Sequence, residues 1–353
     1  MTPPTLTARA LNRALLARQH LLERTTGPME SVVEAMGGLQ TQHAPSGYIG
    51  LWSRLEGVTR AGYTAGLEGR RLIQGWLMRI TIHTVSAADY WPMAAAVRRP
   101  RRELWLRNWR VTDERMVSAA EAVRAALADG PLRQRELVAV LATRGFSREE
   151  TNGAGLWVDL VRVPPQGTWE RPRADRYELA ERWLPAPEPE PDEGTARAYL
   201  LRRYLGAFGP ATLADASSWA GLAVADLRPL AEGMELRRFR DEAGRELLDL
   251  PDAPLPDPDT PAPLRFLGSF DAMLLAQARR TGVLPEEFRP VIFNTRTPQS
   301  WHTFLLDGRV AGTWRYDRHG ISLEPLRAIT AAERAALDEE AHRLERFVTH
   351  GSA

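Results

Sequence analysis

The 353-residue chain contains no cysteine and no lysine. The absence of cysteine excludes disulfides, thiolate metal ligands and a cysteine nucleophile, and it fits a reducing cytoplasm. The absence of lysine means that an enzyme forming a Schiff base would have to use its N-terminal amine. No apolar run approaches the roughly 20 residues that span a bilayer, and the first residues lack the pattern of a signal peptide. We therefore expect a cytoplasmic protein that does not associate with membranes.

The seven histidines are scattered, and none of them forms a pair with metal-ligand spacing on a helix. We therefore expect no metal and no cofactor. The formal net charge is only +1, but a small total can hide a local field. Acidic residues concentrate in residues 187–193 and 252–259, whereas arginines concentrate in residues 98–110. The charge is therefore unevenly distributed along the chain.

Two proline-rich stretches, residues 185–191 and 251–263, are typical of linkers or domain edges. Before each of them the same order of elements is expected, with helices followed by a hairpin. In the first case the predicted helices cover 117–127 and 134–143, and a third helix opens at the capping box of Ser147 and Glu150 and continues to Leu160. Strands are expected at 168–169 and 177–179. In the second case the helices cover 195–208, 215–220 and 225–231, and the hairpin strands cover 236–240 and 246–250.

The N-terminal segment fits the same order more loosely, with helices at 8–22, from 28 onward and near 63–69, then strands within 72–85. The tail differs, because strands at 291–293, 301–306 and 310–315 surround the turn Asp307-Gly308 before a helix at 331–348. We predict a mainly helical α+β protein. Its predicted domains are three tandem winged helices, residues 1–110, 111–186 and 194–262, and a small C-terminal β domain, residues 263–353. Winged helices bind DNA, which we favour here, or serve as protein-interaction modules.

The segment Gly37-Gly38-Leu39-Gln40-Thr41-Gln42 follows the second helix of the first unit. The glycines allow the helix to end there, and glutamines at i and i+2 share one side only on an extended backbone. The alternative is an ordinary solvated helix end.

Three other features have a functional and a structural interpretation. The arginines of residues 98–110 alternate with Trp105 and Trp109, which suits phosphates and base stacking, or a solvated helix with tryptophans in the core. His83 lies in an apolar stretch, as a core residue or a DNA contact. Asp271 is expected to cap a helix or to approach the site from the C-terminal domain.

Several segments together resemble the AlkZ and YcaQ family of winged-helix DNA glycosylases. They are residues 15–22, 38–42, 51–55, 76–83, 270–271, 274–275 and 308–314. The resemblance implies three tandem winged helices with a small C-terminal β domain, and catalysis by Gln40 and Gln42. Thr41 departs from the usual apolar residue between the two functional positions, and Ile80 stands where the family usually has glycine. Neither departure removes a functional side chain. Both departures therefore bear on which substrate is chosen and not on whether the site can act.

On this basis we expect a monofunctional glycosylase that hydrolyses the N-glycosidic bond of N7-alkylated purines in double-stranded DNA, without metal or cofactor. Glutamine cannot act as a general base, but an N7-alkylated purine is already cationic and leaves without protonation. The family implies bulky adducts or interstrand crosslinks from a genotoxin, in repair or self-resistance. The predicted DNA-binding residues are Arg79, His83, Arg98, Arg99, Arg101 and Arg102, on a face from which the acidic residues 187–193 are distant.

We expect the glycosylase to be a monomer that acts on DNA of the nucleoid. The alternative is a non-catalytic winged-helix transcriptional regulator, which would dimerise and prefer particular sequences.

Overall fold

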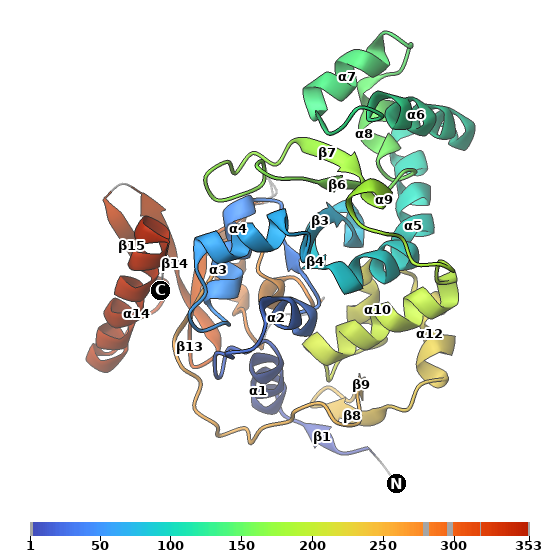
Figure 1. The fold of residues 1–353 in the computed structure, drawn as a ribbon. Coiled ribbons are helices and arrows are strands. Elements are labelled where there is room, and N and C mark those ends of the chain that lie inside the picture. Colours follow the sequence, from blue (N-terminus) through green and yellow to red (C-terminus); the bar gives the residue numbers. More distant parts are fainter. Residues whose placement is uncertain (1–2, 278–281, 295–298, 318, 352–353) are drawn as a thin grey trace.

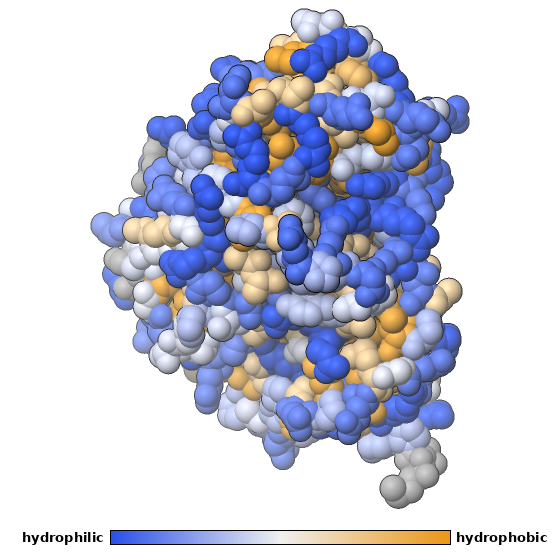
Figure 2. Space-filling view, turned by 45° about the vertical axis from the view of Figure 1, so that its right-hand side comes forward, coloured by the Kyte–Doolittle hydropathy of each residue, from blue (hydrophilic) through white to orange (hydrophobic). Residues whose placement is uncertain are grey.

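The computed structural model describes residues 3–277, 282–294, 299–317 and 319–351 (Figure 1). Helices and strands are mixed along the chain, which confirms the α+β prediction. No helix in these ranges has the length and apolar composition needed to cross a membrane. The face drawn in Figure 2 is mainly hydrophilic, with small groups of hydrophobic residues between polar ones.

The first unit follows the N-terminal strand β1 (Thr5–Leu6) and helix α1 (Ala8–Arg18). Its elements are α2 (Met29–Ala35), β2 (Leu39–Gln40), α3 (Ala44–Trp52), α4 (Arg60–Glu68), β3 (Leu72–Trp76), the 3-10 turn η1 (Met78–Ile80) and β4 (Ile82–Ser86). Helix α3 was not expected, because residues 43–47 were interpreted as a loop. Pro45 lies in the first turn of α3, where its missing N–H costs nothing. The unit ends in the long helix α5 (Ala87–Trp109).

The second unit has α6 (Asp113–Ala126), β5 (Leu132–Arg133), α7 (Gln134–Ala142), α8 (Arg148–Ala154), β6 (Leu160–Arg162), β7 (Arg176–Leu179) and α9 (Ala180–Trp183). The capping box of Ser147 and Glu150 is confirmed at the start of α8. The prediction that this helix reaches Leu160 is wrong, because residues 160–162 form a strand paired with both β3 and β7.

The prediction of a strand at Thr168-Trp169 is also wrong. These residues lie in the loop between β6 and β7. The reason is tertiary: Trp169 stacks on Tyr316 of the C-terminal domain at 5.7 Å and contacts Tyr48 of α3 edge-on. The loop thus spans the first unit and the C-terminal sheet.

Pairing of β3 with β6 joins the first two units into one six-stranded sheet of order β2-β4-β3-β6-β7-β5. This shared sheet was not predicted. The third unit has α10 (Glu193–Phe208), α11 (Leu213–Ala220), α12 (Val224–Glu232), β8 (Arg237–Asp241) and β9 (Glu246–Asp249), and β1 adds to it in parallel with β8. All three units therefore show a helix, two further helices and a hairpin in the same order.

The C-terminal part consists of a four-stranded sheet of order β10-β13-β14-β15, a small hairpin and a final helix. Its elements are β10 (Arg265–Leu267), η2 (Ala272–Leu274), η3 (Glu286–Phe288), α13 (Arg289–Ile292), β11 (Phe293–Asn294), β12 (Gln299–Ser300), β13 (Thr303–Leu306), β14 (Arg309–Asp317), β15 (Gly320–Pro325) and α14 (Ala331–His350). The Asp307-Gly308 turn joins β13 to β14, as predicted. Val291 and Ile292 are helical instead of extended, because Pro290 opens the short helix α13.

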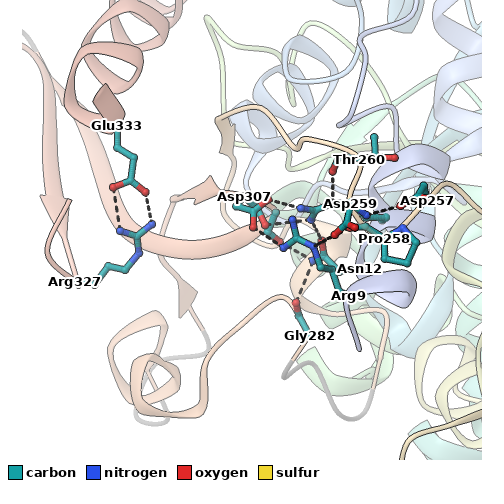
Figure 3. Close-up of polar contacts among 12 residues, drawn as sticks. Arg9, Asn12, Asp257, Pro258, Asp259, Thr260, Gly282, Asp307, Arg327 and Glu333 are labelled. Atoms are coloured by element: carbon teal, nitrogen blue, oxygen red, sulfur yellow. Dashed lines mark hydrogen bonds and ion pairs between the residues drawn. The ribbon is translucent and has the colours of Figure 1, made fainter. Parts of the chain in front are cut away.

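Helix α1 is bonded to the C-terminal part of the chain (Figure 3). Arg9 and Arg13 both form ion pairs with Asp307 of the β13–β14 turn. The side-chain amide of Asn12 donates to the carbonyl of Gly308 at 2.8 Å and to that of Gly282 at 3.0 Å. The same figure shows Arg327 paired with Glu333 at the start of α14.

Two of the apolar cores cross unit boundaries. One runs from α1 and α5 through α10 and α11 to η2, and the other joins α2–α4 to the C-terminal sheet and α14. A third, smaller core belongs to the second unit alone. The segment of residues 37–42 in the first unit is therefore held between the third unit and the C-terminal part.

Candidate active site

Gln40 and Gln42 lie on extended backbone directly after helix α2. The helix ends at Ala35, and Gly37 and Gly38 adopt φ values of 69° and 87°. A Cβ atom at Gly38 would lie 2.9 Å from a methyl group of Val85, so a side chain does not fit there. The prediction that the two glycines end the helix is confirmed.

Strand β2 then pairs with β4, with Gln40 opposite His83. The backbone N–H of Thr41 donates to the carbonyl of Ile82 at 2.8 Å, so the extended conformation continues past the named strand. Alternation follows: Leu39 and Thr41 are buried, whereas Gln40 is half-buried and Gln42 is exposed. The two glutamines therefore share the accessible side of the strand.

The side chains of both glutamines are oriented by donors. The Oε1 atom of Gln40 accepts a hydrogen bond from Arg79 Nη2 at 3.1 Å, and Oε1 of Gln42 accepts one from the backbone N–H of Ile82 at 3.3 Å. Each amide oxygen has two lone pairs, so each keeps accepting capacity for a substrate or water. Among the described residues neither amide contacts a carboxylate.

Arg79 links the motif to the third unit. It has a φ of 55° in the turn between β3 and β4, and its guanidinium also donates to the carbonyl of Trp219 at the end of α11. The following residue, Ile80, has a φ of 56°, a conformation that is costly for a β-branched side chain. Ile80, at the position where the resemblance leads us to expect glycine, adopts the backbone region that glycine favours.

His83 is a core residue in this structure. It is 2% exposed, and burial, with a smaller effect of the Arg79 charge, lowers the pKa of its imidazole to about 3. The neutral ring places Nδ1 3.1 Å from the carbonyl of Thr81, to which it donates. His83 supports the strand opposite Gln40, and it cannot touch DNA without leaving the core.

The arginines of α5 are paired within the protein. Arg98 contacts Asp159 at 2.8 Å and Glu190 at 2.7 Å, and Arg99 contacts Glu193 at 3.0 Å. The expectation that residues 187–193 lie away from these arginines is therefore wrong. The physical reason is that the linker runs back along α5, where opposite charges attract at short range.

Arg101 is buried, whereas Arg102 is half-buried. Arg101 is 4% exposed and pairs with Asp159 at 3.0 Å. Arg102 donates through Nε to the carbonyl of Leu156 at 3.0 Å. Of the tryptophans between the arginines, Trp109 is 49% exposed and its ring packs against that of Trp105. Of the predicted DNA-binding arginines, the structure thus places Arg79 in contact with Gln40. The arginines of α5 contact other parts of the protein instead.

Asp271 has the structural role that was one of its two interpretations. Its carboxylate accepts from Met273 N–H at the start of η2 and pairs at both oxygens with Arg54, at 2.8 and 2.9 Å. Both side chains are almost completely buried. No cluster of three or more His, Cys, Asp or Glu side chains suited to a metal occurs among the described residues.

Comparison with known proteins agrees with this architecture. The family model described as "DNA glycosylase AlkZ-like" matches residues 33–347. The chain is 26% identical to the interstrand DNA cross-link repair glycosylase of Streptomyces sahachiroi. The alignment is 357 residues long and covers 94% of each protein. The solved structure of Streptomyces sahachiroi DNA glycosylase AlkZ has a TM-score of 0.81 and 20% identity, covering 98% of this chain and 97% of that one. That structural likeness concerns the fold.

Proposed function

The chain belongs to the AlkZ-like DNA glycosylase family, and on this premise we propose that it hydrolyses the N-glycosidic bond of N7-alkylated purines in double-stranded DNA. The observation that carries the proposal is the pair of glutamines on one side of a short strand, each amide oxygen oriented by a donor. Oriented amide oxygens suit a reaction in which positive charge develops on the sugar.

The proposed reaction divides the work between the lesion and the protein. An N7-alkylated purine carries a positive charge, so its departure needs no proton from the enzyme and no metal. Gln42, the exposed glutamine, positions the attacking water, and Gln40 stabilises the oxocarbenium-like sugar. A neutral lesion such as uracil lacks the charged leaving group and is a poor substrate for this site.

The proposed enzyme is monofunctional. Strand cleavage by glycosylases proceeds through a Schiff base on an amine, and the chain has no lysine. The product is an abasic site on an intact strand. The Streptomyces sahachiroi relative is named for interstrand cross-link repair, and we extend that substrate class, with bulky N7 adducts, to this chain.

We infer that the three repeated units are winged-helix domains, with boundaries at residues 1–110, 111–186 and 194–262 before the C-terminal β domain. Their order of a helix, two helices and a hairpin supports this. The proposed phosphate contacts are Arg79, Arg98, Arg99 and Arg102, each after exchange of its internal partners. The buried His83 and Arg101 are assigned a positioning role. We further propose a monomer that acts on nucleoid DNA in the cytoplasm.

Release of N7-methylguanine from a labelled duplex tests the function. We expect the wild type to release it and to leave uracil, and Gln42→Ala to lower the rate by roughly one to three orders of magnitude, the effect of losing one positioned polar group. Affinity for the duplex changes little, because phosphate contacts supply most of it. The strand breaks only after alkali or heat, and borohydride traps no adduct.

Thr41→Val is the matched control, because Thr41 lies between the two glutamines but points into the core, bonding Thr84 at 2.9 Å. It loses one hydrogen bond, about 1 kcal/mol of stability, and keeps its excision rate. Strand nicking without alkali, or wild-type rates in both Gln40→Ala and Gln42→Ala, contradicts the proposal.

A further inference from the structure

A pocket of about 340 Å³ lies beside the catalytic motif, and we call it the His43 pocket. Its wall includes His43, Phe270, Trp301, His302, Arg315 and Tyr316. Its size is at the lower end of the range for small-molecule sites, about 300–1,000 Å³.

One wall residue of the His43 pocket is the direct neighbour of the motif in the sequence. His43 directly follows Gln42 and is the N-cap residue of α3. The opposite wall comes from the C-terminal domain, whose Ser269 hydroxyl lies 2.7 Å from that of Ser46 in α3. Phe270, the next residue, has a φ of 60°, a strained conformation of the kind that persists at functional sites. The catalytic loop and the C-terminal domain thus form the pocket together.

The aromatic rings of the pocket differ in whether they are packed against neighbouring rings. His302 stacks on Trp314 with centroids 4.6 Å apart, and Tyr316 stacks on Trp169 at 5.7 Å. These two rings are immobilised by their neighbours. Trp301, in contrast, is 45% exposed and makes no ring contact with any described residue. Within the described part of the chain, its exposed indole in the pocket wall is therefore available for stacking.

The polar groups of the pocket are also available. The Nδ1 atom of His302 accepts the backbone N–H of Ser269 at 2.8 Å, so its proton is on Nε2, which has no partner among the described residues. Burial lowers the pKa of His302 to about 4, which keeps the ring neutral. The side chain of Arg315 is exposed and forms no ion pair or hydrogen bond within the described part of the chain. It supplies a cation suited to a phosphate next to the lesion.

We propose that the His43 pocket binds a planar aromatic substituent carried on N7 of the damaged purine, with Trp301 stacking on it. A methyl group is about the size of a water molecule, whose share of liquid volume is about 30 Å³, so it cannot fill this pocket. A single aromatic ring can, and stacking on a free indole gives affinity without sequence preference. The inference rests on the proposed function, because that function places the lesion beside the pocket. The binding test below does not require catalysis.

The test uses two stable duplexes that contain 7-deaza-7-benzylguanine or 7-deaza-7-methylguanine. Carbon in place of N7 removes the positive charge, so neither base is excised and binding is measured apart from catalysis. We expect the wild type to prefer the benzyl duplex about tenfold, and Trp301→Ala to lower that preference at least about fivefold, the scale of one lost stacking contact. Affinity for the methyl duplex stays within about twofold.

Trp301→Phe keeps an aromatic ring and retains most of the preference. Val291→Ala is the matched control, because Val291 is also 45% exposed, lies in the C-terminal part and is not in the pocket wall. Because Trp301 is at the surface, its replacement leaves the core intact. Equal affinity of the wild type for both duplexes overturns the proposal, and so does an equal loss for both in Trp301→Ala, which would place a DNA base there instead.

Excision of N7-benzylguanine and N7-methylguanine by the same variants separates the two proposals. If the wild type excises neither lesion but prefers the benzyl duplex, the proposed catalysis fails and the pocket stands. If it excises both with no preference in binding, the pocket proposal fails and the catalysis stands.

Discussion

At the scale of single residues, burial changes the pKa values of two histidines near the site more than neighbouring charges do. His83 and His302 are both held neutral, with their pKa values lowered to about 3 and about 4, mainly by desolvation. His83 on β4 is paired with Gln40 on the neighbouring strand β2, and His302 lies in the wall of the His43 pocket. Neither ring carries charge at neutral pH, so neither would repel the cationic lesion that we propose as the substrate.

These histidines predict the acid sensitivity of the protein. The folded-state pKa values lie below the unfolded value near 6.5, so the unfolded chain binds more protons and stability falls as pH decreases from about 6.5. Between its folded-state and unfolded-state pKa values, each histidine lowers the free energy of unfolding by about 1.4 kcal/mol for each pH unit of acidification. This range extends down to about pH 3 for His83 and about pH 4 for His302.

Urea unfolding at pH 7, 6 and 5 measures this slope. We expect His83→Asn to remove the contribution of His83, so its free energy of unfolding decreases less steeply with acid than that of the wild type. His342→Asn is the control, because that side chain is 74% exposed. The same slope in the wild type and in His83→Asn contradicts the assignment.

At the scale of elements, the linker before α10 determines how α5 presents its arginines. Glu190 pairs with Arg98, and Glu193, the first residue of α10, pairs with Arg99 and Arg197. A DNA phosphate would have to displace these carboxylates. The linker therefore competes with DNA for the arginines that we propose as phosphate contacts.

We expect the double variant Glu190→Gln/Glu193→Gln to bind undamaged duplex DNA a few-fold more tightly at low salt. The slope of log affinity against log salt should steepen by about 0.9 for each arginine that gains a phosphate. Fluorescence anisotropy over a salt series measures both. The control Glu246→Gln/Glu286→Gln removes two charges from exposed pairs elsewhere. An equal gain in the control means that net charge, and not the linker, sets the affinity.

At the scale of the whole molecule, buried ion pairs hold the units in their relative positions. Arg54 of the first unit pairs with Asp271 of the C-terminal part, and Arg18 pairs with Asp249 of the third unit, all with nearly complete burial. The motif strand lies between these connections. Its geometry therefore depends on contacts that link residues more than 200 positions apart.

We expect Asp271→Asn to lower the free energy of unfolding by about 3–5 kcal/mol, because it leaves the Arg54 charge buried without a counterion. Arg54→Met/Asp271→Leu should recover most of that loss, since two apolar groups replace the pair. Chemical denaturation measures both. Glu246→Gln, in an exposed pair with Arg238, should cost less than about 1 kcal/mol. A loss in Asp271→Asn as small as this would show that the buried pair does not hold the units together.

Much of the local structure was predictable from the sequence, because its causes are local. The capping box at Ser147, the Asp307-Gly308 turn and the helix end at Gly37-Gly38 each depend on a few neighbouring residues. The α+β class followed from the pattern of helices and hairpins. The two glycines indicated where the helix ends, but the sequence left open whether Gln40 and Gln42 follow on extended backbone or lie at a solvated helix end.

Only the tertiary structure decided which distant groups meet. Residues 160–162 form a strand because β3 pairs with them, and Trp169 leaves the hairpin because its ring packs on Tyr316. The arginines of α5 meet the acidic linker, and Arg79 meets Gln40, for reasons of the same kind. Helix caps and turns are local equilibria that neighbouring residues determine, whereas the partner of a strand edge, a ring or a charge depends on how the whole chain packs.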